Sequence, residues 1–321
     1  MVNSKPRLTI GLPVFNGEAF LRDALDSLLA QSYNDFRLII SDNASTDSTQ
    51  EICLDYTRND NRVSYYRNKR NLGIAWNYNR VFYLSSSEYF KWAAHDDIHD
   101  PEYLRKCIQV LDEDESIVLC HTKNGRIDEH GELIGNYDDR TLTHILSSKP
   151  HERFADLISQ KNPCWSIFGV IRSASLQKTR LNGSYINADR DLLVEIGLVG
   201  RMYEIPEHLF FRRDHSKSYT DKWLKGTRVR DYRSQTMSWR SDGKRPFIVL
   251  PNWRICIEYA KSVQHVHLSR SERLLCYKEL TKWILKEAAP LMKYDLANEL
   301  DLWRLRLISK QLRKITDKIR M

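Results

Sequence analysis

The sequence lacks any run of about 18 apolar, uncharged residues, the length that a membrane-spanning helix requires. Its opening segment, Met1 to Arg7, is short and polar and does not contain the apolar stretch of a secretory signal peptide. The six cysteines of the 321 residues are scattered and form no CxxC pair. These absences argue against a membrane span, a zinc site and a disulfide framework, and they predict a cytoplasmic protein in a reducing environment.

A glycine-rich GxGxxG motif is also missing after the first apolar run, where Gly11-Leu12-Pro13-Val14 stands instead. This disfavours a dinucleotide-binding Rossmann site. No internal repeat or low-complexity segment is visible. With 41% hydrophobic and 29% charged residues, the chain has the composition of an ordinary globular protein that can bury a core.

The net charge of +8 is concentrated in one part of the chain. Residues 223–321 hold about 22 Lys and Arg against about 10 Asp and Glu, whereas the remainder is slightly acidic. The charge therefore argues against a body that binds nucleic acid. It predicts a basic appendage at the C-terminal end.

Apolar runs rich in strand formers alternate with segments of helical spacing through the first part of the chain. The expected strands are 8–14, 36–40, 63–66, 89–94 and 117–120. The expected helices are 20–29 with Asn16 as its cap, 51–56, 74–84, and one that opens at Asp100-Pro101. This alternation is typical of a doubly wound, mostly parallel α/β sheet flanked by helices. We expect such a domain over residues 1–222 and a basic, mainly helical extension over residues 223–321.

Asp96 and Asp97 directly follow the expected strand 89–94, where ligands of a parallel sheet bind. Two adjacent carboxylates repel each other unless a cation lies beside them. Carboxylate and phosphate oxygens are the ligands that Mg²⁺ and Mn²⁺ prefer. The pair therefore predicts a metal site, although a turn and a helix cap that includes Asp100 would explain the same residues.

Two further polar segments stand at the same expected edge of the sheet. Asp42 follows the second strand and precedes a run of capping residues that ends at Asp47. Asp42 lies at the strand end, where it can accept hydrogen bonds from a base or a ribose. Asn71 and Gly73 precede the next helix and open on the same edge, although a simple helix entry accounts for them equally well.

The order of these segments resembles the inverting family 2 glycosyltransferases with the GT-A fold. The segments are Leu12-Pro13-Val14-Phe15-Asn16, Ser41-Asp42-Asn43-Ala44-Ser45-Thr46-Asp47, Arg70-Asn71-Leu72-Gly73 and His95-Asp96-Asp97. Each is weak alone, but the four occur in the right order, each after an expected strand or at a helix entry. The resemblance covers roughly residues 5–220 and implies a nucleotide-sugar donor, with UDP the usual nucleotide, and a divalent metal.

The resemblance also implies roles for individual residues. Pro13 and Phe15 would line the nucleotide site, and Asp42 would contact the base. Asn71 and Gly73 would lie under the diphosphate and ribose. The segment His95-Asp96-Asp97 stands where the family has its DXD signature, so Asp96 would face ribose or donor sugar and Asp97 would bind the metal. His95 departs from a strict DXD.

Inverting transfer needs a carboxylate that removes the proton of the acceptor hydroxyl. The family places this base in a Glu-Asp pair just before a helix, and here Ala188 replaces the Glu. Asp189 therefore aligns with the base, and Asp191 is the second candidate. Acidic residues also suit the first turn of a helix through its dipole alone, and that explanation stays open.

A third group of candidates follows the apolar run 205–211. Arg212 and Arg213 could neutralise the leaving diphosphate, and His215 could be an additional metal ligand, although a surface loop would also explain them. Residues 216–226 read as a lid over the donor. Trp165, Phe168 and Gly169 could form a wall for a glycan or lipid-linked acceptor, or they could belong to the core.

Residues 302–321 form a basic amphipathic helical pattern. Such a helix can lie on an anionic membrane surface, which would place the protein at the inner face of the membrane, or it can pack on its own domain or a second subunit in a homodimer. Two other functions stay open. A nucleotidyltransferase shares the frame and the acidic site but usually carries a glycine-rich basic loop that is not visible here. A non-catalytic scaffold that binds carbohydrate or membrane could keep the same fold.

Overall fold

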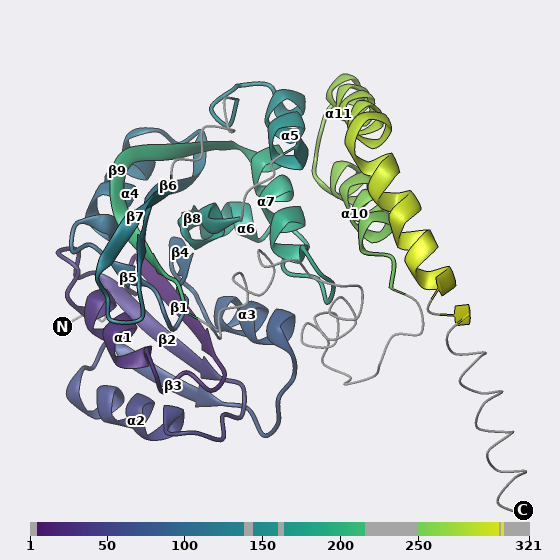
Figure 1. Cartoon of the computed structure of the whole chain (residues 1–321). Helices are drawn as coiled ribbons and strands as arrows, with labels where there is room; N and C mark the ends of the chain where they lie inside the picture. Colours follow the sequence, from purple (N-terminus) through teal and green to yellow (C-terminus); the bar gives the residue numbers. More distant parts are fainter. Residues whose placement is uncertain (1–4, 138–143, 160–163, 216–248, 302, 305–321) are drawn as a thin grey trace, which may run out of the picture.

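The computed structural model describes residues 5–137, 144–159, 164–215, 249–301 and 303–304 (Figure 1). Within these residues the chain forms a nine-stranded sheet with the order β3-β2-β1-β4-β8-β6-β9-β5, and β7 pairs with β6. The strands are β1 (Leu8–Val14), β2 (Phe36–Asp42), β3 (Val63–Arg67), β4 (Tyr89–Trp92), β5 (Ile98–His99), β6 (Ile117–Ile127), β7 (Leu133–Tyr137), β8 (Val170–Arg172) and β9 (Arg201–Arg213).

The first half of the sheet is parallel, as the alternation of strands and helices predicted. β3, β2, β1 and β4 are parallel neighbours, and β6 and β9 also pair in parallel. The short β8 is antiparallel to both β4 and β6, and β5 is antiparallel to β9. The α/β class with a mostly parallel, helix-flanked sheet is therefore confirmed.

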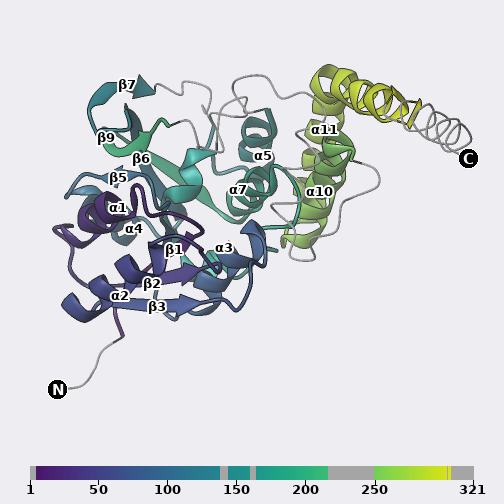
Figure 2. The ribbon, with the colours of Figure 1, turned by 60° about the horizontal axis from the view of Figure 1, so that its bottom comes forward.

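Helices cover both faces of the sheet (Figures 1 and 2). One core contains the buried faces of α1, α2 and α4, and the other contains those of α3, α5, α7, α10 and α11. Their bounds are α1 (Leu21–Leu29), α2 (Thr49–Asn59), α3 (Ile74–Tyr83), α4 (Tyr103–Glu113), α5 (Pro150–Ser159), α6 (Ser173–Leu176), α7 (Ala188–Val199), α10 (Pro251–His265) and α11 (Arg270–Trp283), which continues as a π-helical turn (Ile284–Ala288).

Two local expectations were wrong. Asn16 does not cap the first helix, because α1 is preceded by Phe20 and the side chain of Asn16 accepts instead from the N–H of Thr46 (2.8 Å). The strand expected at 117–120 continues to Ile127, because the second half of β6 pairs with both β7 and β9. Residues 121–126 are mostly polar, and their strand conformation comes with pairing on both sides.

The C-terminal helices α10 and α11 share a core with the domain that precedes them. Tyr259 and Val263 of α10 and Cys276 of α11 are fully buried against α5 and α7, and Figure 1 shows α10 and α11 outside these helices. No helix within the described residues is both long and apolar enough to cross a membrane. The division at residue 222 stays a prediction, since residues 216–248 lie outside the described part.

Arg180, in the loop between α6 and α7, holds α10 to α7 through three buried carboxylates. Its guanidinium donates to Asp191 (2.9 Å), to Glu258 (2.6 Å) and to Glu195. The three carboxylate side chains are at most 4% exposed. Removal of the arginine would leave Asp191 and Glu195 without this cation, whereas Glu258 would keep Arg254 and Lys261.

We therefore expect Arg180→Met to lower the free energy of unfolding by about 3–5 kcal/mol at pH 7.5. Loss of the cation raises the carboxylate pKa values, so the variant takes up protons on acidification and its deficit shrinks toward pH 5. Urea denaturation at both pH values measures this. The matched control is Arg22→Met, whose exposed side chain pairs with Asp55 at 3.5 Å. Equal stability of the two variants would contradict the role of Arg180.

Candidate active site

The carboxyl ends of β1, β2 and β4 meet at one edge of the sheet, as expected for parallel neighbours. Val14 lies opposite Asp42, and the N–H of Asn43 donates to the carbonyl oxygen of Val14 (2.8 Å). Pro13 is buried within β1, whereas the side chain of Phe15, just beyond it, is 43% exposed. Phe15 is thus the first apolar surface available to a ligand at this edge.

Asp42 is fully buried, and both of its carboxylate oxygens accept hydrogen bonds. Oδ1 accepts from the N–H of Ser45 (2.8 Å), and Oδ2 accepts from the hydroxyl of Tyr65 and the guanidinium of Arg67 (2.7 Å each). Sequence reasoning missed Tyr65 and Arg67, although both lie near the end of β3. The Arg67 side chain is 33% exposed, so the hydrogen-bond network of Asp42 reaches the solvent through Arg67.

Amide side chains order the segment before α3. Oδ1 of Asn71 accepts from the side-chain amide of Asn43 and from the N–H of Gly73 (2.9 Å each). Gly73 has a φ of 84°, a left-handed conformation that favours glycine, and α3 begins directly after it. Asn71 and Gly73 therefore lie at the same edge as Asp42.

Asp96 and Asp97 form the turn between β4 and β5, and His215 lies beside them. Nε2 of His215 is 2.9 Å from Oδ2 of Asp96, and the N–H of Arg213 donates to Oδ1 of Asp97 (3.1 Å). His215 stands two residues beyond β9. The parallel pairing of β9 with β6 brings it next to Asp96, although the two residues are more than a hundred positions apart in sequence. Asp97 is 5% exposed.

The two carboxylates have opposite electrostatic environments. Burial and the negative charge of Asp96 raise the pKa of Asp97 well above its usual range. Burial also raises the pKa of Asp96, but the interactions with His95 and His215 lower it by more. The pKa of Asp96 is therefore below its usual value. A cation beside the pair would stabilise the ionised form of both carboxylates.

His95 reaches this turn because residue 17 is glycine. A Cβ atom on Gly17 would lie 2.8 Å from Cδ2 of His95 and 2.7 Å from Cγ2 of Val14, closer than such atoms approach. The side chain of His95 therefore packs over the end of β1. This close approach explains the glycine.

Arg213 fastens the turn rather than facing the solvent. Its guanidinium donates to the carbonyl oxygens of Asp96 (3.0 Å) and Glu129 (3.0 Å) and to the carboxylate of Asp23 (2.8 Å). It also stacks on the ring of Phe20 (4.8 Å) and is 1% exposed. These contacts use the guanidinium of Arg213, so it would not bind phosphate directly. Its contribution to a phosphate site would be to hold the turn in position.

Arg212 has a different environment. Its guanidinium donates to the carboxylate of Asp214 (2.7 Å) and lies 5.3 Å from the ring centre of Trp165. Arg212 is 6% exposed. The residues 216–226, expected to form a lid just beyond it, lie outside the described part of the chain.

Asp189 and Asp191 both lie in the first turn of α7 but face different partners. Asp191 is buried and accepts hydrogen bonds from Tyr185 (2.6 Å), Ser262 (2.7 Å) and Arg180. Burial raises the pKa of Asp191 to about 6, although these three partners each lower it. Two helical positions two residues apart differ by about 200° around the axis. Asp189 therefore points away from α10.

Tyr78 of α3 marks where Asp189 points. Besides burial, the negative charges of Asp96, Asp97 and Asp189 all raise the pKa of its phenol, so all three carboxylates act on the same tyrosine. Burial likewise raises the pKa of Asp189. Tyr78 carried no signal in the sequence, since it reads there as one aromatic residue of an amphipathic helix.

The expected acceptor wall lies mostly in the core. Trp165 is 8% exposed and packs edge-on against Tyr137 (4.3 Å between ring centres). The ring of Phe168 packs on Phe210 (5.8 Å), and a Cβ on Gly169 would lie 2.7 Å from the carbonyl oxygen of Cys120. Core packing thus accounts for Phe168 and Gly169, and an acceptor role for this segment stays a prediction.

The donor atoms at the turn suit a divalent cation whose remaining coordination positions are filled by phosphate oxygens. Two carboxylates and an imidazole gather there, although no cluster of three or more His, Cys, Asp or Glu side chains arranged to hold a metal occurs in the part of the chain that the structure describes. Mg²⁺ usually binds through one or two carboxylates with water and substrate phosphates as the remaining ligands. The residues therefore suit a metal that arrives with a nucleotide.

Comparison with known proteins shows the family of the chain. Residues 9–177 match glycosyl transferase family 2, and the chain belongs to that family. An uncharacterized glycosyltransferase of Rickettsia typhi is 35% identical over 118 residues, which is 36% of this chain and 36% of the relative. The match thus spans about a third of the curated relative.

Solved structures share the fold. S. aureus TarS 1–349 in complex with UDP superposes with a TM-score of 0.61 at 15% identity, over 88% of this chain and 73% of that one. The mannosyltransferase PcManGT from Pyrobaculum calidifontis, in complex with GDP-Man and Mn²⁺, superposes with a TM-score of 0.51 at 14% identity, over 94% and 88%. The GT-A fold that the sequence predicted is confirmed.

Arg213→Lys tests whether this arginine fastens the turn. Lysine cannot span several acceptors with one planar group, so we expect the free energy of unfolding to fall by about 1–3 kcal/mol and Mn²⁺ affinity to fall with it. Urea denaturation and Mn²⁺ titration calorimetry with UDP present measure both. Arg105→Lys, at an exposed ion pair with Glu102, is the control. Unchanged Mn²⁺ affinity in Arg213→Lys would refute the role.

Proposed function

We propose that this protein is an inverting glycosyltransferase that moves one sugar from a nucleotide-diphosphate sugar to a hydroxyl of a glycan or lipid-linked acceptor. The observation that carries the proposal is the arrangement around Tyr78. Asp96 and Asp97 after β4 and Asp189 of α7 all act electrostatically on its phenol, which supports one site for the three carboxylates. In the proposed site the pair after β4 serves the diphosphate and Asp189 serves the acceptor hydroxyl.

The nucleotide would lie across the ends of β1 and β2. Phe15 offers an apolar surface for the base, and Asp42 with Arg67 supplies polar groups of both signs beside it. Asn71 and Gly73 would lie under the diphosphate and ribose. UDP is the proposed nucleotide, supported by the complexes of S. aureus TarS with UDP and with UDP-GlcNAc.

A divalent metal, Mn²⁺ or Mg²⁺, would be held by Asp97 with Asp96 and His215. When bound, it neutralises the charge that develops on the leaving diphosphate. Arg213 keeps Asp96 and Asp97 in place through its backbone and guanidinium contacts. Of the two arginines, Arg212 is the candidate proposed for a direct contact with phosphate. The Mn²⁺ in the PcManGT complex supports a metal of this kind.

Asp189 is the proposed base. Two observations support this: Asp189 takes no part in the hydrogen bonds of Asp191, and its charge acts on the phenol of Tyr78. It would accept the proton of the acceptor hydroxyl as that oxygen attacks the anomeric carbon from the face opposite the diphosphate. Burial raises the pKa of Asp189, which makes it a stronger base than an exposed aspartate.

The acceptor, the membrane contact of residues 302–321 and a homodimer stay predictions. Residues 305–321 lie outside the described part of the chain. An acceptor on a lipid carrier at the inner face of the membrane would suit a basic tail, since anionic lipids attract such segments.

We expect Asp189→Asn to reduce kcat by about 10²–10⁴ while UDP affinity stays unchanged, because the variant lacks only the proton acceptor. In the wild-type protein the base works when ionised, so kcat falls as pH drops through a pKa above that of an exposed aspartate. Donor turnover and UDP titration calorimetry measure both. Asp301→Asn, with a 70% exposed side chain, is the control. Release of pyrophosphate instead of UDP would indicate a nucleotidyltransferase.

His215→Ala tests the metal site. The side chain lies 2.9 Å from Asp96, so its loss should weaken Mn²⁺ binding by about 10- to 100-fold without a comparable loss of stability. Calorimetric titration of Mn²⁺ with UDP present measures the affinity. His267→Ala, in the loop between α10 and α11, is the control. Wild-type Mn²⁺ affinity in His215→Ala would remove this histidine from the site.

A further inference from the structure

Helix α3 contacts both parts of the candidate active site. It packs on β1 and β2, whose carboxyl ends are here called the donor edge. It also contacts the start of α7, where Ala75 of α3 forms a small buried cluster with Ala188, the residue before Asp189. A single helix therefore lies against the proposed nucleotide site and against the element that carries the proposed base.

Asn77 links α3 to the donor edge through a buried side chain. Its amide nitrogen donates to the carbonyl oxygen of Ser41 (2.8 Å), and its amide oxygen accepts from the hydroxyl of Ser41 (2.7 Å). The same oxygen accepts from Asn68 (3.3 Å), which also donates to the side chain of Asn43 (2.9 Å). Asn43 in turn accepts from the N–H of Leu72 (2.9 Å). Asn77 therefore helps to order the segment that is proposed to lie under the diphosphate and ribose.

Asn79 links α3 to the loop that leads into α7. Its amide nitrogen donates to the carbonyl oxygen of Asn182 (2.9 Å), and its amide oxygen accepts from the N–H of Asn182 (3.0 Å). Asn79 lies four residues after Ala75, so the two residues share the face of α3 that meets α7. Asn77 is about 200° away from Asn79 around the helix axis. The two asparagines therefore bind on different sides of one helix.

The loop that Asn79 binds is itself bound to α7. Arg180, two residues before Asn182, donates to the carboxylate of Asp191 in α7 (2.9 Å). Leu181, between these two anchored residues, has a φ of 59°, a left-handed conformation that is costly for a residue with a side chain and persists only where the surroundings hold it. The hydrogen bonds of Asn79 therefore connect α3 with α7 through a short, restrained piece of chain.

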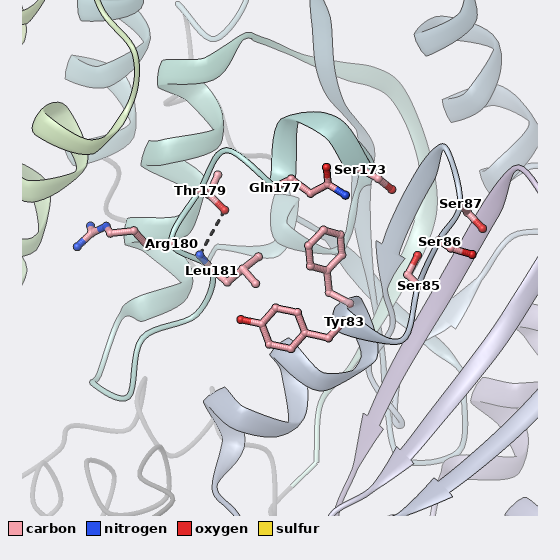
Figure 3. Close-up of a pocket in the computed structure, with 10 residues that line it drawn as sticks. Tyr83, Ser85, Ser86, Ser87, Ser173, Gln177, Thr179, Arg180 and Leu181 are labelled. Carbon is pink, nitrogen blue, oxygen red and sulfur yellow. Dashed lines mark hydrogen bonds between the residues drawn. The ribbon is translucent and has the colours of Figure 1, made fainter.

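Packing does not fill the whole space between α3 and this loop. A pocket of about 380 Å³ lies between them, and Figure 3 shows Leu181 and Tyr83 beside it, with Arg180 directed away from α3. Side chains that line a gap lose the van der Waals contacts that they would otherwise make across it. The hydrogen bonds of Asn79 therefore matter more for the position of the loop than they would in a closely packed contact.

We propose that α3 sets the separation between the donor edge and Asp189, with Asn77 as the positioning residue on the donor side and Asn79 as the positioning residue on the side of the base. Both act through other residues, and neither is a catalytic residue. The role of Asp189 in this proposal rests on the proposed glycosyl transfer. The two links of α3 can be tested without turnover.

Amide hydrogen exchange on the full chain, followed by NMR, separates the two links. The N–H of Leu72 reports the donor side, and the N–H groups of Asn182 and Asp191 report the loop and the first turn of α7. We expect Asn77→Ala to speed exchange at Leu72 about tenfold and to leave Asp191 within twofold of wild type. We expect Asn79→Ala to speed exchange at Asn182 and Asp191 about tenfold and to leave Leu72 within twofold.

Titration calorimetry with UDP and Mn²⁺ gives a second readout of the donor side. Asn77→Ala should weaken UDP binding about tenfold, whereas Asn79→Ala should leave it within twofold of wild type. In donor turnover the effects should be reversed, so that Asn79→Ala lowers kcat at an unchanged donor KM. A variant that merely destabilises the fold would not separate these quantities.

Milder variants cover the case in which an alanine variant does not fold. Ser41→Ala removes one hydroxyl that donates to Asn77 and should weaken UDP binding about threefold. Asn79→Asp keeps an acceptor for the N–H of Asn182 and loses the donor to its carbonyl oxygen, so exchange at Asn182 should rise less than in Asn79→Ala. The matched control is Asn59→Ala, an exposed asparagine at the end of α2 that bonds within its own helix, and it should behave as wild type.

The outcomes separate this proposal from the proposed function. An equal rise in exchange at Leu72 and Asp191 in both alanine variants indicates a general loss of stability and overturns the division of roles. Unchanged exchange at Asp191 in Asn79→Ala overturns the link to α7. A wild-type protein that binds no UDP counts against the proposed donor, and the exchange pattern still decides whether α3 holds the two sides.

Discussion

The turn at Asp96 and Asp97 depends on the far end of β9. Two adjacent carboxylates with little exposure repel each other, and they hold one geometry only when donors fix them. Arg213 supplies a backbone N–H to Asp97 and a guanidinium to the carbonyl oxygen of Asp96, and His215 follows two residues later. The pairing of β9 with β6 and β5 brings these groups to the turn, so the site joins the two halves of the sheet.

The same requirement recurs at the other buried carboxylates. Asp42 receives donors from its own loop and from β3, and Asp191 receives donors from the loop before α7 and from α10. Each network joins elements that are distant in sequence, and partial loss leaves a charge that the interior cannot solvate. Mutations in these networks should therefore act on stability and on the position of site residues together.

The longer elements up to α4 could be predicted from periodicity, because each is a local pattern of apolar residues, whereas the two-residue β5 could not. The pairings could not. β6 runs to Ile127 since β7 and β9 flank it, and nothing in residues 121–127 alone specifies two partners. Arg213 looks in sequence like a phosphate ligand, and its buried contacts depend on Asp23 and Glu129. The roles of Asp189 and Asp191 can be distinguished only when it is known that α10 packs on the face of α7 that carries Asp191.

Gly17 shows how a missing side chain shapes the donor edge. A Cβ atom on Gly17 would meet the ring of His95 on one side and the side chain of Val14 on another. The missing side chain at residue 17 therefore gives the ring of His95 its room at the end of β1, next to the turn that carries Asp96. A side chain at residue 17 would displace both His95 and Val14, so it would disturb the turn and the end of β1 together.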